Sequence, residues 1–211
     1  MKIAIDGPAA SGKGTLARTL AMKLSFDYLD TGTLYRAVAR EALAKSFIIS
    51  EENQSIQQLV DLCHQLDLPI ANDDSLRSAN VAQAASKIAS LAEVRSALVE
   101  KQRSFAQNPP SGKGAVLDGR DIGTVILPDA DIKFYIDADI NVRAKRRHLE
   151  LQASGTEISQ AEVLADLTER DARDKNRTTA PLIAAKDAIF IDTSQKNAEE
   201  VLQLTLSYFE R

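Results

Sequence analysis

Near its N-terminus the chain carries a glycine-rich segment that constrains its fold more than any other stretch. A short apolar run at residues 3–5 leads into residues 7–15, which read GPAASGKGT, and apolar residues at helical spacing follow. This order predicts a strand, a phosphate-binding loop and a helix, because backbone N–H groups and the helix N-terminus would face an anion. Lys13 would reach the outer phosphates of a nucleoside triphosphate. The residues predicted to bind this ligand are Gly7, Pro8, Ala9, Ala10, Ser11, Gly12, Lys13, Gly14 and Thr15.

Two oxygen-bearing residues are candidate ligands of Mg²⁺. Phosphate loops usually place Ser or Thr directly after the lysine, whereas Gly14 here separates Lys13 from Thr15. Asp118 follows an apolar run, a position where phosphate-loop proteins commonly use an acidic residue to hold Mg²⁺, directly or through water. Thr15 and Asp118 are therefore the predicted metal ligands. The alternative for Asp118 is a structural turn at the end of a strand.

The length, charge and cysteine content limit the class of protein. A chain of 211 residues can bury one substantial core, and without a long Gly/Ser-rich or Pro-rich linker we expect a single domain over residues 1–211. The net charge of −4 argues against a dedicated nucleic-acid binder. No stretch approaches about 18 apolar residues, and no leader-like segment precedes the first strand, so neither a membrane span nor secretion is expected. The single cysteine, Cys63, is interpreted as a packing residue and fits a reducing compartment, so we expect a cytoplasmic protein.

Short apolar runs predict five strands separated by helices, the pattern of a parallel α/β sheet that binds its ligand at the carboxyl ends of the strands. The strands are predicted at residues 3–5, 26–30, 115–117, 132–137 and 188–192. Helices are predicted at residues 34–45, 50–66, 80–105, 141–151, 160–173 and 197–209, with 80–105 divided into two helices near Ser90. Residues 31–111 and 152–183 are too long for simple crossovers, and we expect them to project from the sheet as insertions.

Residues 111–114, which read SGKG, repeat part of the phosphate loop. The copy follows Pro109 and Pro110, precedes a predicted strand instead of a helix, and has Gln107 where the motif needs glycine. We therefore interpret residues 111–114 as a connecting loop that binds no phosphate.

Two charged segments and one further arginine are candidate phosphate contacts. Residues 118–124 read DGRDIGT and place charged side chains among glycines at the predicted ligand-binding edge of the sheet. Residues 169–177 read ERDARDKNR, for which a solvated helix face is the usual explanation. Phosphoryl transfer, however, needs several cations around the migrating group, and an insertion can supply them as the site closes. Arg36 is the further candidate.

In type and order, these segments resemble the bacterial cytidylate kinase family over essentially the whole chain. The motifs that carry the resemblance are GP-x₃-GKGT at 7–15, LDTG at 29–32 with Tyr35 and Arg36, DGRDIGT at 118–124 and RDARDKNR at 170–177. The resemblance implies a phosphate-loop kinase core with a monophosphate-binding insertion at 31–111 and a lid at 152–183. It also implies that ATP, with Mg²⁺, donates its γ-phosphoryl group to CMP or dCMP.

The resemblance further assigns roles to individual residues. The groups that would neutralise the charge spreading during transfer are Lys13, Arg120, Arg170 and Arg177. The acceptor phosphate would be held by Arg36, Arg120 and Arg177, and its pentose by Arg170 and Asp174. Thr31 stands at an acceptor-site position where the family usually has Ser.

Asp121, Arg95 and Ser86 resemble the family's set of cytosine contacts. Cytosine presents an amino donor beside its N3 and O2 acceptors, so a carboxylate opposite the amine and cationic or hydroxyl donors opposite the acceptors form a matched set. Uracil would place an oxygen against Asp121, and an unpaired buried carboxylate costs more than a lost contact. We therefore expect CMP to be preferred over UMP.

The connection between the helices predicted at 50–66 and 80–105 is short. Longer members of the family carry an extra β-rich piece in this insertion, whereas residues 66–78 here form only a brief link. Arg77, near the end of that link, is a further candidate phosphate contact.

Other functions are alternatives. A related kinase would phosphorylate UMP, AMP or a small alcohol such as shikimate, but an alcohol needs a base near its hydroxyl and an arginine-rich site favours a phosphate acceptor. A nucleotide-dependent switch with slow hydrolysis would show no acceptor-stimulated release of ADP. Nucleic-acid binding through the basic segment Arg143–His148 is the weakest alternative, because these residues are expected to form a solvated or lid-supporting face. We expect small-molecule substrates, no nucleic-acid or membrane partner, and a monomer.

Overall fold

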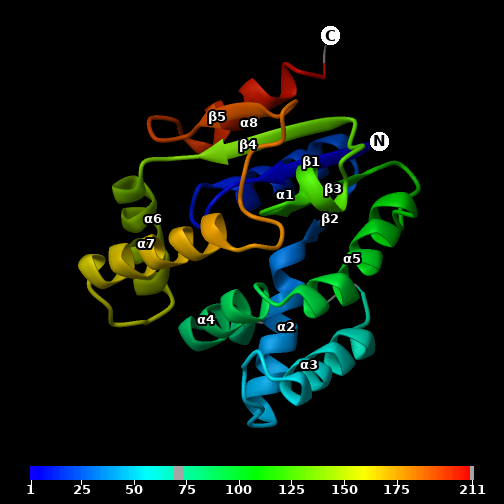
Figure 1. Ribbon diagram of the computed structural model, residues 1–211. Coiled ribbons are helices and arrows are strands. Elements are labelled where there is room, and N and C mark those ends of the chain that lie inside the picture. The colour runs from blue at the N-terminus through cyan, green and yellow to red at the C-terminus, as the bar shows by residue number, and fades with distance from the viewer. Residues whose placement is uncertain (69–73, 210–211) are drawn as a thin grey trace.

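The computed structural model in Figure 1 describes residues 1–68 and 74–209. Five strands form one parallel sheet in the order β2-β3-β1-β4-β5. The strands are β1 (Lys2–Asp6), β2 (Asp27–Asp30), β3 (Ala115–Gly119), β4 (Ile132–Asp137) and β5 (Ile189–Asp192). Central strands of a parallel sheet are covered on both faces, which explains why apolar runs mark them in the sequence. The predicted α/β class, with five parallel strands, is confirmed.

Three neighbouring strands carry an aspartate at their carboxyl ends. Asp6 is the last residue of β1, Asp30 is the last residue of β2, and Asp118 is the penultimate residue of β3. Asp30 lies opposite Asp118 in the sheet register, and Asp6 lies opposite Gly119. The three carboxylates therefore gather at the edge of the sheet where parallel α/β folds bind their ligands.

Helices cover both faces of the sheet. Alternate residues along a strand point to opposite faces, and the buried clusters follow this alternation. Ile3 and Val116 lie in one cluster with residues of α1 (Lys13–Leu24) and α8 (Ala198–Leu206). Ala4 and Leu117 lie in another, with the turn at Ile122–Ile126 and the C-terminal part of α5 (Ala92–Gln107).

A second helical layer lies beside the carboxyl edge of the sheet. It contains α2 (Thr31–Ala44), α3 (Asn53–Gln65), α4 (Ala79–Ile88), most of α5 and a short 3₁₀ turn at Asp74–Arg77 (Figure 1). These helices share a hydrophobic cluster of their own, which includes Leu34, Leu59 and Leu98. Cys63 is fully buried in this cluster, which confirms its interpretation as a packing residue. The side chain of Arg77, predicted as a phosphate contact, lies outside the described part of the chain.

The helices α6 (Ile140–Ala153) and α7 (Gln160–Asn176) cross at a wide angle and pack against each other beside the phosphate loop (Figure 1). Ala144, Leu151, Val163 and Leu167 pack together with Ala9 of the loop. Ser159 caps α7 through reciprocal hydrogen bonds with Glu162, which fixes where the helix begins. This pair therefore connects the charged run at 169–177 to the loop through apolar contacts.

The bounds of the predicted elements differ from the observed ones by up to three residues, and two differences lie next to the ligand-binding edge of the sheet. The helix after β2 begins at Thr31, three residues before the predicted start, because the Thr31 hydroxyl donates to the Asp118 carbonyl at 2.8 Å and closes the chain against β3. Residues 122–126, predicted as loop, form a π-helical turn. The prediction for residues 111–114 is confirmed in its structural part, since they precede β3 and Ser111 donates to Asp27. Among the described residues, we find no helix with the length and apolarity to cross a membrane.

Candidate active site

The loop between β1 and α1 has the backbone shape that its glycines require. At Gly7, with φ of 154°, an added Cβ would lie 2.0 Å from the Ile136 carbonyl oxygen, so only glycine allows β4 to approach this closely. Gly12, with φ of 91°, caps α1 in the left-handed region, and Lys13 is the first residue of the helix. The loop therefore leads directly into the N-terminus of α1, whose unpaired backbone N–H groups can bind an anion.

A layer of polar side chains holds the outside of this loop. Arg143 of α6 is 5% exposed and donates to the carbonyls of Ala9 (3.3 Å) and Ala138 (2.9 Å) and to the Asp171 carboxylate (2.6 Å). Thr193, after β5, donates to the Ser11 carbonyl at 2.9 Å. Sequence reasoning placed Arg143 on a solvated or lid-supporting face. The structure shows that it supports both the loop and α7 from a buried position.

A cavity of about 520 Å³ opens beside the loop, between α7 on one side and α2 and α4 on the other. Seven cationic side chains line it: Lys13, Arg18, Arg36, Arg120, Arg147, Arg170 and Arg173. The acidic side chains that line it, among the residues that the structure describes, are Asp30, Glu150 and Asp166. A protein with a net charge of −4 thus presents a locally positive cavity, which favours ligands that carry several negative charges.

Lys13 lines the cavity where the loop enters α1. Its ammonium donates to the Pro8 carbonyl at 3.3 Å. Burial, together with the positive charge of Arg120, lowers the pKa of Lys13 to about 7, against the attraction of Asp118 and Asp30. A bound polyphosphate would favour the charged ammonium and raise this pKa again.

Asp118 faces the loop from β3. Tyr28 donates to its carboxylate at 2.8 Å, and the other carboxylate oxygen would lie 3.7 Å from a Cβ placed on Gly14. Burial raises the pKa of Asp118 to about 6, and the neighbouring Asp30 adds to the rise. A cation near Asp118 would therefore be stabilised by a carboxylate that little water reaches.

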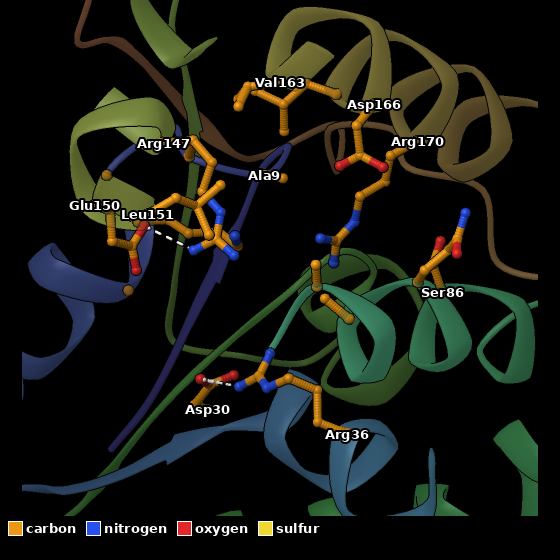
Figure 2. Close-up of a pocket in the computed structure, with 18 of the residues that line it drawn as sticks. Ala9, Asp30, Arg36, Ser86, Arg147, Glu150, Leu151, Val163, Asp166 and Arg170 are labelled. Atoms are coloured by element: carbon orange, nitrogen blue, oxygen red, sulfur yellow. Dashed lines mark hydrogen bonds and ion pairs between the residues drawn. The ribbon is translucent and has the colours of Figure 1, made fainter. Parts of the chain in front are cut away.

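On the far wall of the cavity, arginines are held by carboxylates but keep free donors. Arg36 binds Asp30 at 2.7 Å, and Arg120 binds Asp174 at 2.9 Å. Figure 2 shows Arg170 extending from α7 into the cavity toward this wall. The Nε atoms of Arg36 and Arg170 are buried and have no hydrogen-bond partner among the described residues. Buried donors without partners are rare in folded proteins, and their presence here indicates a ligand.

The residues predicted to read the base form a buried network behind this wall. The Arg95 guanidinium hydrogen-bonds the Asp121 carboxylate, and Arg177 lies 3.6 Å from the other oxygen of Asp121. Arg95 and Asp121 are each only 5% exposed. Ser86 of α4 accepts a hydrogen bond from Arg173 of α7 at 2.8 Å, which connects two elements on opposite sides of the cavity. Arg173 belongs to the charged motif at residues 170–177, but the sequence predicted no individual role for it.

The structure brings most of the predicted site residues to the cavity. Those that line it are Ala9, Ala10, Gly12, Lys13, Gly14, Thr15, Arg36, Ser86, Arg120 and Arg170. The others lie behind the lining and contact it or one another: Gly7, Pro8, Ser11, Thr31, Arg95, Asp118, Asp121, Asp174 and Arg177. Arg143 and Asp6 were not predicted as site residues. Arg143 belongs to a basic segment that was interpreted as a solvated or lid-supporting face, and Asp6 lies one residue before the recognised loop motif.

A phosphate loop at the end of β1, a parallel sheet and a cavity lined by arginines at the carboxyl ends of its strands together define a phosphate-loop kinase. The sequence model of the cytidylate kinase family matches residues 3–211. The chain belongs to this family and is an ATP-dependent nucleoside monophosphate kinase.

Curated relatives support this assignment over nearly the full length. The cytidylate kinase of Paramagnetospirillum magneticum is 50% identical over 208 residues, which cover 97% of this chain and 95% of that protein. The cytidylate kinase of Bartonella bacilliformis is also 50% identical, with coverages of 94% and 89%. A crystal structure of an uncharacterized protein from Eubacterium ventriosum aligns with 100% of this chain and 98% of its own, at a TM-score of 0.51 and 13% identity, which shows the fold alone.

The two SGKG segments offer a matched pair of lysine variants. Lys13→Met removes the cation at the loop and is expected to lower kcat at least about 10²-fold, because charge developing on the phosphoryl group loses its nearest partner. Lys113→Met changes the same tetrapeptide at an exposed position and is expected to keep near-normal turnover. The steady-state rate of ADP release measures the turnover of both variants. Near-normal turnover of Lys13→Met would show that the phosphate loop does not contribute to catalysis.

The lowered pKa of Lys13 predicts a proton linkage. At pH 8 a group with a pKa of about 7 is mostly neutral in the free protein, whereas phosphates bound beside it favour its charged form. ATP binding at pH 8 should therefore take up a proton, and at pH 6 it should not. Calorimetric titrations in buffers of different ionisation enthalpy measure this uptake, which should disappear in Lys13→Met; equal uptake in that variant would assign the proton to another group.

Proposed function

We propose that phosphoryl transfer from ATP to CMP, and to dCMP, takes place in the cation-lined cavity between the phosphate loop and the helices α2, α4 and α7. The observation that carries this proposal is the positive lining itself, together with the unpartnered Nε of Arg170. Two phosphorylated substrates bring the negative charges that such a lining needs. A small uncharged alcohol would leave these arginines without partners.

The phosphate loop forms the donor half of the site. Residues 7–15 hold the phosphates of ATP, with Lys13 on the outer ones. A second cavity of about 240 Å³ shares Gly12 and Thr15 with the first and is also lined by Arg146, Lys196 and Val201. A nucleotide whose phosphates lie on the loop can place its nucleoside in this second cavity, so the same few residues would orient both ends of ATP.

The arginines of the opposite wall form the acceptor half. Arg36, Arg120 and Arg177 hold the phosphate of CMP, while Arg170 and Asp174 contact its pentose beside Thr31. An oxygen of that phosphate attacks the γ-phosphorus in line, and Lys13 with Arg120, Arg170 and Arg177 neutralises the spreading charge. The attacking oxygen is already anionic, so the reaction needs no general base.

Mg²⁺ fits the donor half. The Thr15 hydroxyl and the Asp118 carboxylate supply oxygen donors on either side of Gly14, and no group of three His, Cys, Asp or Glu residues within 1–68 and 74–209 forms a metal cage by itself. Mg²⁺ is usually held by one or two protein oxygens together with phosphates and water. When bound, it would neutralise charge on the β- and γ-phosphates.

Residues 31–111 serve as the acceptor-binding insertion, and residues 152–183 serve as the lid. The insertion has a hydrophobic core separate from that of the sheet, which would let it move as a unit. The lid helix α7 carries Arg170, Asp174 and the Arg173 that meets Ser86 across the cavity. Closure would therefore bring cations and base contacts to the acceptor together. Because one chain builds both halves of the site, we propose a monomer; the buried free thiol of Cys63 is compatible with the reducing cytoplasm.

A panel of acceptors tests the proposed reaction. With ATP and Mg²⁺, CMP and dCMP should stimulate ADP release, UMP should do so less well, and AMP and shikimate should have little effect. Release of ADP is followed by a coupled assay at saturating ATP. A switch protein would release ADP at the same slow rate with every acceptor, and the kinase assignment of the site would then be wrong.

Asp121→Asn tests the reading of the base. Its amide presents an oxygen or a donor NH₂, so it can face either cytosine or uracil, whereas the carboxylate accepts only from the cytosine amine. The ratio of kcat/KM for CMP over UMP should therefore fall about tenfold or more, the effect of one hydrogen bond to a charged group. An unchanged ratio would show that Asp121 does not discriminate between the bases.

A further inference from the structure

Asp6 connects the two halves of the site without lining the cavity. It is the last residue of β1 and directly precedes Gly7, where the phosphate loop begins. Its side chain points to a different segment: one carboxylate oxygen accepts from the Ile122 N–H at 2.8 Å and the other from the Gly123 N–H at 2.7 Å. The carboxylate therefore grips two successive peptide groups, and with only 4% exposure it does so out of reach of water.

The segment that Asp6 grips carries the acceptor-recognising pair. Arg120 and Asp121 immediately precede Ile122, and the Asp121 carbonyl accepts from the N–H groups of Val125 and Ile126 to close the π-helical turn. Fixing the first two amides of this turn fixes the orientation of the residues just before it. One residue thus belongs to the donor loop through its backbone and to the acceptor segment through its side chain.

At the other end of the turn, a positively charged side chain binds the backbone carbonyl groups. Arg103 of α5 donates to the carbonyls of Ile126 and Val125, each at 3.0 Å. A carboxylate at the N–H end and a guanidinium at the carbonyl end both match the direction of the peptide dipoles. Arg103 stabilises the same turn from the end remote from Arg120 and Asp121, which makes it a natural control.

Burying an ionised carboxylate at this position costs desolvation free energy. The charged groups that act on Asp6 are Asp121, which opposes its charge, and Arg120, which favours it. Lys133 and Tyr135 of β4 face the same region. Burial raises the pKa of Asp6 to about 7 even though both amides favour its charged form. Among side chains of this length, only a carboxylate offers two acceptor oxygens in one plane to two neighbouring N–H groups.

We propose that Asp6 is a positioning residue that holds Arg120 and Asp121 in register with the phosphate loop, so that the acceptor phosphate and base meet the γ-phosphoryl group in line. The proposal rests on the proposed function of Arg120 and Asp121 as acceptor contacts.

Asp6→Asn removes one of the two bonds while keeping the size of the side chain. Its amide oxygen can still accept from one N–H, but its NH₂ opposes the other. We expect the KM for CMP to rise about tenfold, the effect of losing one hydrogen bond to a charged group, while the KM for ATP changes less than about twofold. The preference for CMP over UMP should fall in the same variant, because Asp121 would no longer be held against the base.

Arg103→Met is the matched control. It removes the cap at the far end of the turn and should lower the thermal midpoint, as Asp6→Asn does, but leave the KM for CMP and the CMP preference unchanged. If Asp6→Asn lowers only the thermal midpoint, or raises the KM values of ATP and CMP equally, the positioning role is wrong. Failure of the base-reading hypothesis is separate, since it would appear as an unchanged CMP preference in Asp121→Asn.

Gly123→Ala provides a second approach if Asp6→Asn does not fold. A Cβ at Gly123 would lie 3.4 Å from the Asp6 carboxylate and 3.1 Å from the Lys133 side chain, so it presses on the same contact from the other side. We expect a smaller rise in the KM for CMP, in the same direction and with the KM for ATP preserved. A folded Gly123→Ala enzyme with wild-type KM for CMP would overturn the proposal.

Discussion

The burial of negative charge at the carboxyl edge of the sheet is the constraint on which the site depends. Asp6, Asp30 and Asp118 end three adjacent strands, and each has a different partner: two backbone amides, the Arg36 guanidinium, and the Tyr28 hydroxyl. Unpaired charges at this depth would oppose folding. The partners required by these carboxylates are the same groups that shape the proposed donor and acceptor sites, so in this proposal folding and substrate binding use one set of interactions.

Carboxylates hold the arginine wall that we propose to bind the acceptor in shape before any substrate binds. Asp30 orients Arg36, and Asp174 orients Arg120, so the guanidinium groups do not have to be ordered by the ligand. Although burial disfavours the charged carboxylate, Arg120 and Arg170 hold the pKa of Asp174 below its usual range. A wall of pre-oriented cations reduces the entropy lost on binding a phosphate, and it disfavours acceptors that offer no negative charge.

Local sequence patterns predicted the elements but not the contacts that join them. The strand, glycine-rich loop and helix at residues 3–20 could be predicted because all of their signals lie within one short segment. The contacts of Asp6 with Ile122 and Gly123 join residues more than a hundred positions apart, and those of Arg143 with Ala9 join residues 134 apart. Nothing in the sequence near Asp6 or Arg143 distinguishes them from solvated charges. The start of α2 was mispredicted for the same reason. α2 begins at Thr31, whose hydroxyl binds the Asp118 carbonyl of β3, a residue distant in the sequence.

The buried thiol of Cys63 can be used to measure opening of the helical layer that surrounds it. Burial raises the pKa of this thiol to about 12, so almost none of it is the reactive thiolate at neutral pH. It lies in the cluster shared by α2, α3, α4 and α5 and is the single cysteine of the chain. The rate at which a thiol reagent modifies the native protein therefore follows the opening of this helical layer, separately from unfolding of the sheet, without any label having to be introduced.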